Sequence, residues 1–390
     1  MLNRILSDDK RSKYVNILFY MALTIELVLM IVEKSEISFS YESYVFRVTF
    51  LISLVAALLI KRDTKEWIVT LALLGFTFVC YHLSGKNDLL RIVTFILAAR
   101  DIDLKKVMKY TLFVSGAGFL VIALLALFGI GGDVFLIADY GRELEEEKRL
   151  VLGFGHPNTL LGCVFALTLM WLWIYGEAGK LLHYVLVIFV SVITTYFTRS
   201  RTGLLVLLLT LIFAVFVRLF PKARQNKVLY VAGFMITPVL CTGLAIAAAW
   251  AAQFMYSGVD RTKYWRFWKL EELLNYRISN LYYAVDDHGG ILSSWRLFAR
   301  SGADGYFDMG WVRLFYWYGI IPTALILIAI AFMIYVCCQR RDAWTLLIIL
   351  SLSVYTIVEA TFVSRYIGRA FFLPIAGVYL GELIKGKTDD

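Results

Sequence analysis

The side chains best suited to binding phosphate belong to two arginines. They lie in a short polar turn between apolar stretches. The turn reads TRSRTG and contains Arg199 and Arg201. A guanidinium stays charged under all conditions, and its forked N–H donors match the oxygens of a phosphate group. The simpler alternative is that both arginines mark a turn and extend to lipid headgroups. We expect an anion-binding role, because the order of the apolar stretches places this turn outside a membrane, where positive charge is disfavoured.

A second polar segment, GHPN, opens an apolar stretch and contains His156 and Asn158. These side chains bring hydrogen-bonding groups to a membrane surface, as a headgroup or sugar site requires. Pro157 between them fits a helix start, since a proline in the first turn of a helix loses no hydrogen bond. For His156 and Asn158, a helix start and a binding role are both open.

Three side chains are candidates for a general base. His288 is the only histidine of a long polar segment, Asp308 ends that segment, and Glu359 lies near the end of a later apolar stretch, ahead of Arg365. A histidine or a carboxylate can accept the proton of a hydroxyl that attacks a sugar. For Glu359, an ion pair with an arginine is an equal alternative, because buried charges are usually paired. Arg365 is a further candidate for binding the substrate.

The composition is that of a helical membrane protein. Hydrophobic residues make up 60% of the chain and charged residues 18%, and the mean hydropathy is +0.72. Several unbroken apolar stretches are long enough to cross a bilayer as helices, whereas a membrane β-barrel would show short alternating segments. The formal charge of +9 fits basic cytoplasmic loops, and we expect no nucleic-acid partner. The five cysteines have no metal-site spacing, and we expect neither a metal nor a cofactor.

We predict an all-α polytopic transmembrane bundle of about twelve spans, forming a single integral membrane domain over residues 1–390. The fourth span is short, so the count carries an uncertainty of one or two. The predicted spans are residues 14–33, 44–60, 66–83, 88–99, 109–131, 158–175, 182–198, 203–219, 228–250, 309–337, 344–362 and 366–384.

The distribution of lysine and arginine predicts the orientation. Basic residues precede the first span and follow the second, fourth, eighth and tenth spans. All of these segments fall on one side if the spans alternate, and that side is the cytoplasm, together with both termini. The loop 132–157, the Arg199/Arg201 turn and a large loop at 251–308, before the last three spans, then lie outside the cytoplasmic membrane. We expect the site on this outer face.

Three stretches resemble motifs of the Wzy-type polysaccharide polymerases, within the O-antigen ligase/polymerase superfamily. They are LGFGHPNTLLG at 152–162, SRTGLL at 200–205 and DMGWVRLFYWYGI at 308–320. The resemblance extends loosely over the whole chain, including the number of spans and the large outer loop. Two features depart from the family pattern: Met309 replaces the usual asparagine, and His288 lies well before the third motif.

The resemblance implies a glycosyltransferase that polymerises undecaprenyl-pyrophosphate-linked oligosaccharide repeat units into a capsule, exopolysaccharide or O-antigen. Arg201 matches the arginine of the Ser-Arg motif, and Arg277 matches the loop arginine ahead of the third motif. In the family such arginines are thought to engage the pyrophosphate of the donor. The implied partners are the lipid-linked oligosaccharide, membrane lipid, a flippase and a chain-length regulator.

The chemistry of the outer face agrees with this interpretation. Nucleotide sugars are not supplied there, so a glycosyl donor must arrive already activated on a lipid. Its pyrophosphate leaving group needs positive charge where negative charge develops, and Arg199, Arg201 and Arg277 can supply it without a metal.

Two other functions remain as alternatives: a ligase that transfers finished glycan to another acceptor, and a flippase or transporter for lipid-linked sugar. A flippase should line a central passage with charges from both leaflets, whereas the polar groups here gather at the outer end. Asp101 and Asp103 match the Asp-x-Asp of nucleotide-sugar glycosyltransferases. They lie in a short cytoplasmic turn without a nucleotide-binding domain, and we give this match no weight.

Overall fold

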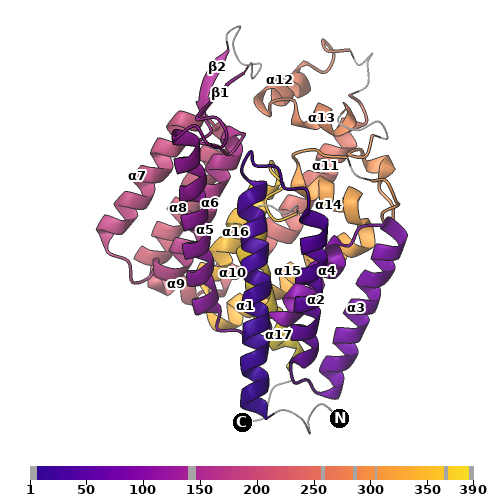
Figure 1. Cartoon of the computed structure of the whole chain (residues 1–390). Coiled ribbons are helices and arrows are strands. Elements are labelled where there is room, and N and C mark those ends of the chain that lie inside the picture. The colour runs from indigo at the N-terminus through magenta and orange to yellow at the C-terminus, as the bar shows by residue number, and fades with distance from the viewer. Residues whose placement is uncertain are drawn as a thin grey trace. The chain divides into compact units, whose positions relative to one another are not determined.

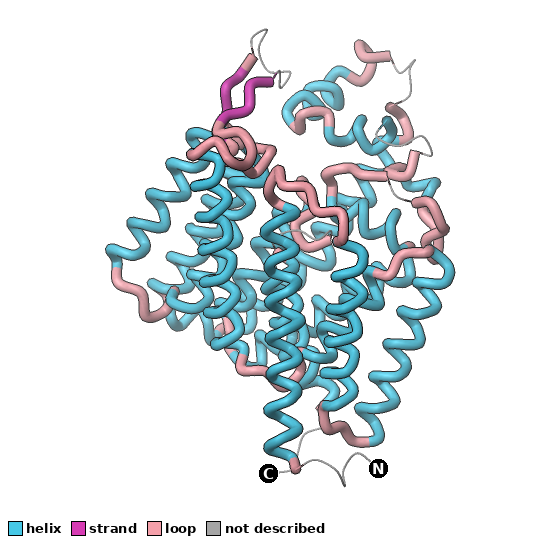
Figure 2. Tube along the Cα trace, viewed as in Figure 1, coloured by secondary structure: helices cyan, strands magenta, loops and turns pink. Residues whose placement is uncertain are grey.

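The structure is a computed structural model, and it describes residues 7–138, 146–255, 260–283, 288–303, 305–363 and 368–385. Helices dominate this part of the chain (Figure 1). Its only strands, β1 (Phe135–Ala138) and β2 (Glu147–Leu150), form an antiparallel hairpin inside the predicted loop 132–157 (Figure 2). The prediction of a helical membrane bundle is confirmed at this level.

In the described residues, nine helical segments are long and apolar enough to cross a membrane. One of them, Lys227–Ala252, is composed of α10 (Lys227–Phe234), the π-helical turn η2 (Met235–Cys241) and α11 (Thr242–Ala252). The other eight are α1 (Asp8–Glu33), α2 (Glu42–Leu59), α3 (Thr64–Ser84), α5 (Leu104–Leu127), α6 (Pro157–Tyr175), α7 (Leu181–Thr198), α8 (Arg201–Leu219) and α15 (Ile320–Arg340).

Three predicted spans correspond to shorter helices, so the count of about twelve stays a prediction. These are α4 (Asp88–Ala98), α16 (Ala343–Thr356) and α17 (Arg369–Ile384), with 11, 14 and 16 residues. The remaining short elements are α9 (Pro221–Gln225), α12 (Trp265–Leu273), α13 (Arg277–Tyr283), η3 (Leu292–Ser294) and α14 (Gly310–Tyr318).

The predicted span 309–337 is wrong as a single helix, because the chain breaks at Gly319. This residue has φ +94° and separates α14 from α15. A Cβ at this position would collide with the backbone around Phe298, and the backbone conformation is one that residues with side chains rarely adopt. The structure therefore gives the third motif a short helix of its own.

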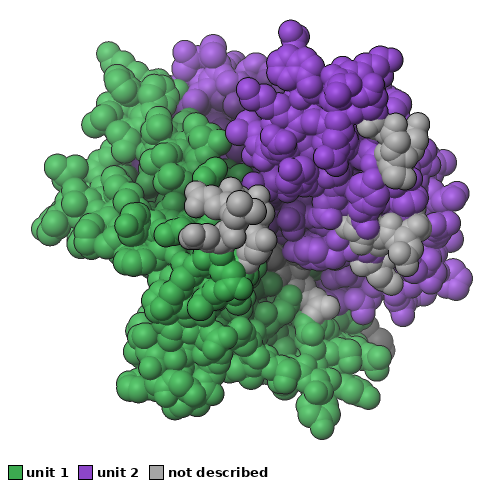
Figure 3. Space-filling model, turned by 90° about the horizontal axis from the view of Figure 1, so that it is seen from above, with its two compact units in different colours: residues 1–63, 94–223, 365–390 green, residues 64–93, 224–364 purple. Residues whose placement is uncertain are grey.

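The chain forms two compact units, each made of separated segments (Figure 3). Unit 1 contains residues 1–63, 94–223 and 365–390, and unit 2 contains residues 64–93 and 224–364. The expectation of one integral membrane domain stays a prediction.

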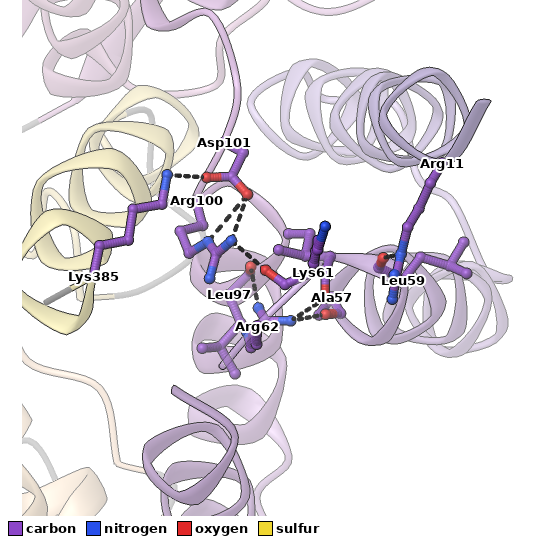
Figure 4. A network of polar contacts seen from close by, with 10 residues as sticks. Arg11, Ala57, Leu59, Lys61, Arg62, Leu97, Arg100, Asp101 and Lys385 are labelled. Carbon is purple, nitrogen blue, oxygen red and sulfur yellow. Dashed lines mark hydrogen bonds and ion pairs between the residues drawn. The ribbon is translucent and has the colours of Figure 1, made fainter. Parts of the chain in front are cut away.

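Basic residues from loops predicted to be cytoplasmic meet at one end of unit 1 (Figure 4). The network joins the start of α1, the end of α2, the turn after α4 and the end of α17. Its hydrogen bonds run from Arg11 to Leu59, from Arg62 to Ala57 and Leu97, from Arg100 to Lys61 and Asp101, and from Lys385 to Asp101. This convergence agrees with the predicted alternation of the spans, and the side of the membrane stays a prediction.

Both carboxylates of the Asp-x-Asp sequence have structural roles at this end. Burial alone would raise the pKa of Asp101, but hydrogen bonds from Arg100 and Lys385 hold it below its ordinary value. Asp103 caps α5 by accepting the N–H of Lys106 at 3.1 Å, and this bond lowers the pKa of Asp103. These contacts agree with giving the sequence no weight as a nucleotide-sugar motif.

Candidate functional site

The glycine-rich loop after α5 is fixed to the end of α1 opposite the Arg11 network. Glu36, just beyond α1, accepts the N–H of Asp133 at 2.7 Å, and its own N–H donates to the carbonyl of Gly153 at 3.1 Å. Gly155 has φ +68°, and a Cβ there would press on the Glu36 side chain. Glu36 was not identified from the sequence, and it positions the loop that leads into the GHPN segment.

The GHPN segment starts α6, as the simpler interpretation expected. The Nδ1 atom of His156 accepts the N–H of Asn158 at 3.2 Å, and Pro157 occupies the first helical turn. His156 is exposed and Asn158 is half-buried. The structure thus assigns a capping role to one ring nitrogen of His156, and sugar binding by His156 and Asn158 stays a prediction.

The β-hairpin and the arginine turn meet at this end of unit 1. Arg199 ends α7 in a left-handed conformation, with φ +52°. Its Nη1 lies 3.9 Å from the Glu147 carboxylate, and Glu147 also pairs with Arg149 at 2.8 Å. The sequence placed the loop and the turn on one side, and the contact between Glu147 and Arg199 joins them directly. Arg149, which is only 3% exposed, was missed.

Arg201 begins α8 directly after this turn. It is exposed, and its side chain makes no hydrogen bond or ion pair with the residues that the structure describes. Ser200 precedes the helix without a side-chain capping bond. The positive end of the α8 dipole therefore carries an additional cation, an arrangement that a bound anion would stabilise.

In unit 2, Arg277 and Glu359 form a buried ion pair. The Nη2 of Arg277 lies 3.0 Å from Oε1 of Glu359, and Nη1 donates to the carbonyl of Val358. Glu359 thus forms the ion pair with an arginine that was one of its two alternatives, and the arginine is Arg277. Since both terminal nitrogens of Arg277 are engaged, a forked contact with pyrophosphate requires this pair to open. Arg365 lies outside the described residues.

The start of α13 is held by a second carboxylate. Glu271 is fully buried, and its Oε1 accepts both the N–H and the hydroxyl of Ser279, at 2.7 and 2.8 Å. These bonds fix the first turn of α13, and with it the backbone of Arg277. Glu271 was also missed, because its place among the aromatic and basic residues of α12 indicated only an interfacial segment.

Asp308 precedes α14 but does not cap it. The N-cap residue is Met309, and it provides no side-chain capping bond. The next residue, Gly310, packs against Glu359 and Ala360 so closely that a Cβ would clash there. The packing places the Asp308 segment beside the Arg277–Glu359 pair, and the carboxylate of the half-buried Asp308 is not used to start the helix.

His288 is held by its own loop. Its ring stacks on Tyr282 with a centroid separation of 4.0 Å, and Nδ1 lies 2.7 Å from the Tyr282 carbonyl oxygen. A carbonyl only accepts hydrogen bonds, so Nδ1 carries the proton and Nε2 is the basic nitrogen of the neutral ring. His288 is therefore a positioned base candidate.

The part of the chain that the structure describes contains no group of three or more His, Cys, Asp or Glu side chains that could hold a metal ion. Comparisons of the chain with protein families, curated proteins and solved structures find no match.

Proposed function

We propose that the chain is a glycosyltransferase that polymerises undecaprenyl-pyrophosphate-linked oligosaccharide repeat units on the outer face of the cytoplasmic membrane. The observation that carries the proposal is the cationic start of α8. Arg199 and Arg201 flank the uncapped helix end, and of these two arginines only Arg199 lies near Glu147, which also pairs with Arg149. Charge of this kind stabilises a pyrophosphate as it leaves a sugar.

The proposed reaction forms a bond from an acceptor hydroxyl oxygen to the anomeric carbon of the donor sugar. The bond from this carbon to the pyrophosphate oxygen breaks, and the lipid pyrophosphate leaves with the electron pair. The hydroxyl proton passes to a base. Asp308 is our first candidate for this base and His288 the second, because the Glu359 carboxylate is paired with Arg277.

Replacing Asp308 with asparagine is expected to reduce polymerisation about 100-fold or more, since the amide cannot accept the proton. Helix α14 should form normally, because Asp308 does not cap it. The measurement uses purified protein in lipid vesicles with lipid-linked repeat units, for which the wild-type protein should give a ladder of oligomers.

Glu272→Gln, which changes an exposed carboxylate in the same unit, should keep the wild-type rate, and His288→Ala should keep more activity than Asp308→Asn. A wild-type rate for Asp308→Asn would exclude Asp308 as the base and leave His288 as the candidate. If the wild-type protein instead transferred whole glycan to a different acceptor, the ligase alternative would replace polymerisation.

The predicted topology is tested by labelling with a thiol reagent that does not cross membranes. Thr262→Cys, in the large outer loop, should react in intact cells, whereas Lys222→Cys should react only after the cells are opened. Both substitutions are made in a protein that also carries Cys338→Ser. This change removes the one half-buried native cysteine, and the other four cysteines are buried. Equal labelling of the two positions in intact cells would contradict an outer site.

A further inference from the structure

Arg313 is a fully buried cation that forms no ion pair with any carboxylate of the described residues. The residue lies in α14 with an exposed fraction of 0%. By strict hydrogen-bond geometry its three side-chain nitrogens, Nε, Nη1 and Nη2, have no partner among the described residues, and the Tyr306 hydroxyl is only a weak, poorly aligned acceptor beside them. The guanidinium instead contacts two aromatic faces, with its Cζ 3.6 Å from the ring centroid of Tyr306 and 4.7 Å from that of Trp317.

Aromatic faces alone do not compensate for this burial. A guanidinium offers five N–H donors, and each loses water when the group is buried. A ring face attracts the charge but accepts no conventional hydrogen bond, so it recovers only part of the lost hydration. Native proteins satisfy nearly all buried polar groups, and an exception of this kind calls for a functional explanation.

Among the described residues, no neighbouring carboxylate supplies the missing acceptors, and the Tyr306 hydroxyl could serve at most one of the five N–H groups. The Glu359 carboxylate pairs with Arg277. Asp308 attracts Arg313 electrostatically, but no hydrogen bond joins them. Partial desolvation raises the pKa of the Tyr306 hydroxyl above its ordinary value, so Tyr306 is neutral at physiological pH and offers Arg313 no negative charge.

The two rings differ in how firmly they are held. Trp317 donates from Nε1 to the Gly305 carbonyl at 3.0 Å, and Lys86 lies 5.0 Å from its ring centroid. Tyr306, in contrast, is 54% exposed while one face covers the guanidinium. Rotation of the Tyr306 side chain would therefore make the Arg313 guanidinium accessible, while the Trp317 ring would stay in place beside it.

We propose that Arg313, Tyr306 and Trp317 form a subsite for an anionic part of the substrate, an oxyanion held beside a sugar ring. A guanidinium binds two oxygens of a carboxylate or phosphate at once, and aromatic faces pack against the apolar face of a sugar. The oxyanion belongs either to an acidic sugar of the repeat unit or to the lipid pyrophosphate. This inference rests on the proposed function. It adds a substrate class to that function, namely a repeat unit or carrier group with a negative charge, which would bind beside Asp308.

Binding to purified protein in detergent tests the subsite with three probes: a glucuronate-containing disaccharide, the matched neutral glucose disaccharide, and geranyl pyrophosphate. We expect at least one anionic probe to bind, and Arg313→Met to weaken that binding at least tenfold. If Arg313→Met no longer binds the glucuronate disaccharide more tightly than the neutral disaccharide, the oxyanion belongs to the sugar. If Arg313→Met loses binding of geranyl pyrophosphate alone, the oxyanion belongs to the lipid carrier. Anion binding that is unchanged in Arg313→Met would overturn the proposal.

The Tm of the Arg313 variants distinguishes a binding role from a structural role. Replacing Arg313 should raise the Tm if the residue binds substrate, and should lower it if the residue holds the fold together. Removing an unpaired buried charge should raise the Tm of the protein without ligand by about 2 °C. Arg296→Met, which removes an exposed arginine of the same unit, should change neither the Tm nor the binding. Arg313→Lys keeps the charge but loses the fork, and it should fold and bind the anionic probe at least fivefold more weakly. A fall in Tm for both Arg313 variants would identify a structural role and reject the subsite.

These measurements separate the two proposals. Polymerisation by the wild-type protein together with Arg313-independent anion binding would reject the subsite alone. Arg313-dependent binding by a protein that does not polymerise lipid-linked repeat units would reject the proposed function alone.

Discussion

Replacing Arg201 with lysine is expected to abolish most polymer while the protein reaches the membrane at its normal level. Arg201 is exposed at the start of α8, and its side chain forms no hydrogen bond or ion pair with a described residue, so its replacement should cost little stability. An ammonium keeps the charge but cannot present the planar fork that grips two phosphate oxygens. Removing one donor from a charge-stabilising site typically lowers the rate 100-fold or more. Polymer should fall by about this factor in cells, with single repeat units accumulating on the lipid carrier.

Arg218→Lys is the matched control for this prediction. Arg218 lies in the last turn of the same helix, with its guanidinium carbon 4.4 Å from the ring centroid of Tyr184. Its replacement should leave the polymer at the wild-type level. Normal polymer from Arg201→Lys would mean that the arginine only marks the turn and contacts lipid, and the proposed function would lose the observation on which it depends.

Hydropathy predicted the helices well where a change in polarity coincides with a change in backbone conformation. The predicted spans 158–175 and 182–198 correspond to Pro157–Tyr175 and Leu181–Thr198. Both have polar residues near each end, and in α6 the side chain of His156 also caps the N-terminus of the helix. An apolar window responds to side-chain transfer from water and not to dihedral angles. It therefore passed through Gly319, where the neighbouring residues are apolar but the backbone turns.

Predicting the site from the sequence succeeded for residue types and failed for partners. Charged residues at the ends of apolar stretches are recognisable, because each carries a cost that usually has a functional or structural reason. Which carboxylate faces which arginine is a tertiary property. An ion pair with an arginine was one of two equal alternatives for Glu359, and its partner Arg277 lies 82 residues earlier in the chain. No local spacing rule connects two residues that far apart.

Arg149 and Arg313 were missed for different physical reasons. Arg149 resembles one more charge in an acidic and basic loop, and only the pairing of β1 with β2 turns it inward. Arg313 stands in the quoted DMGWVRLFYWYGI motif, where the aromatic residues around it indicated a span. The signal was available, since an arginine inside an otherwise apolar segment is a candidate functional residue.

Breaking the Arg277–Glu359 pair should have a large effect on stability and should separate its structural role from its chemical role. Both side chains are buried, at 9% and 8% exposure. Removing one partner takes the bonded counter-charge away from the other in a medium of low dielectric constant, at a cost of about 3–5 kcal/mol. Arg277→Met and Glu359→Met should therefore each lower the free energy of unfolding by this amount, measured by denaturant titration of the purified protein.

The double variant Arg277→Met/Glu359→Met should recover most of the lost stability, because it buries no unpaired charge and keeps a similar side-chain volume. We expect its polymerisation to remain at least tenfold below wild type, since Arg277 is then no longer able to engage the pyrophosphate when the pair opens. Recovery of both stability and polymerisation would show instead that the pair only holds α13 to the segment after α16. In that case Arg201, together with Arg199, would be left to bind the leaving group.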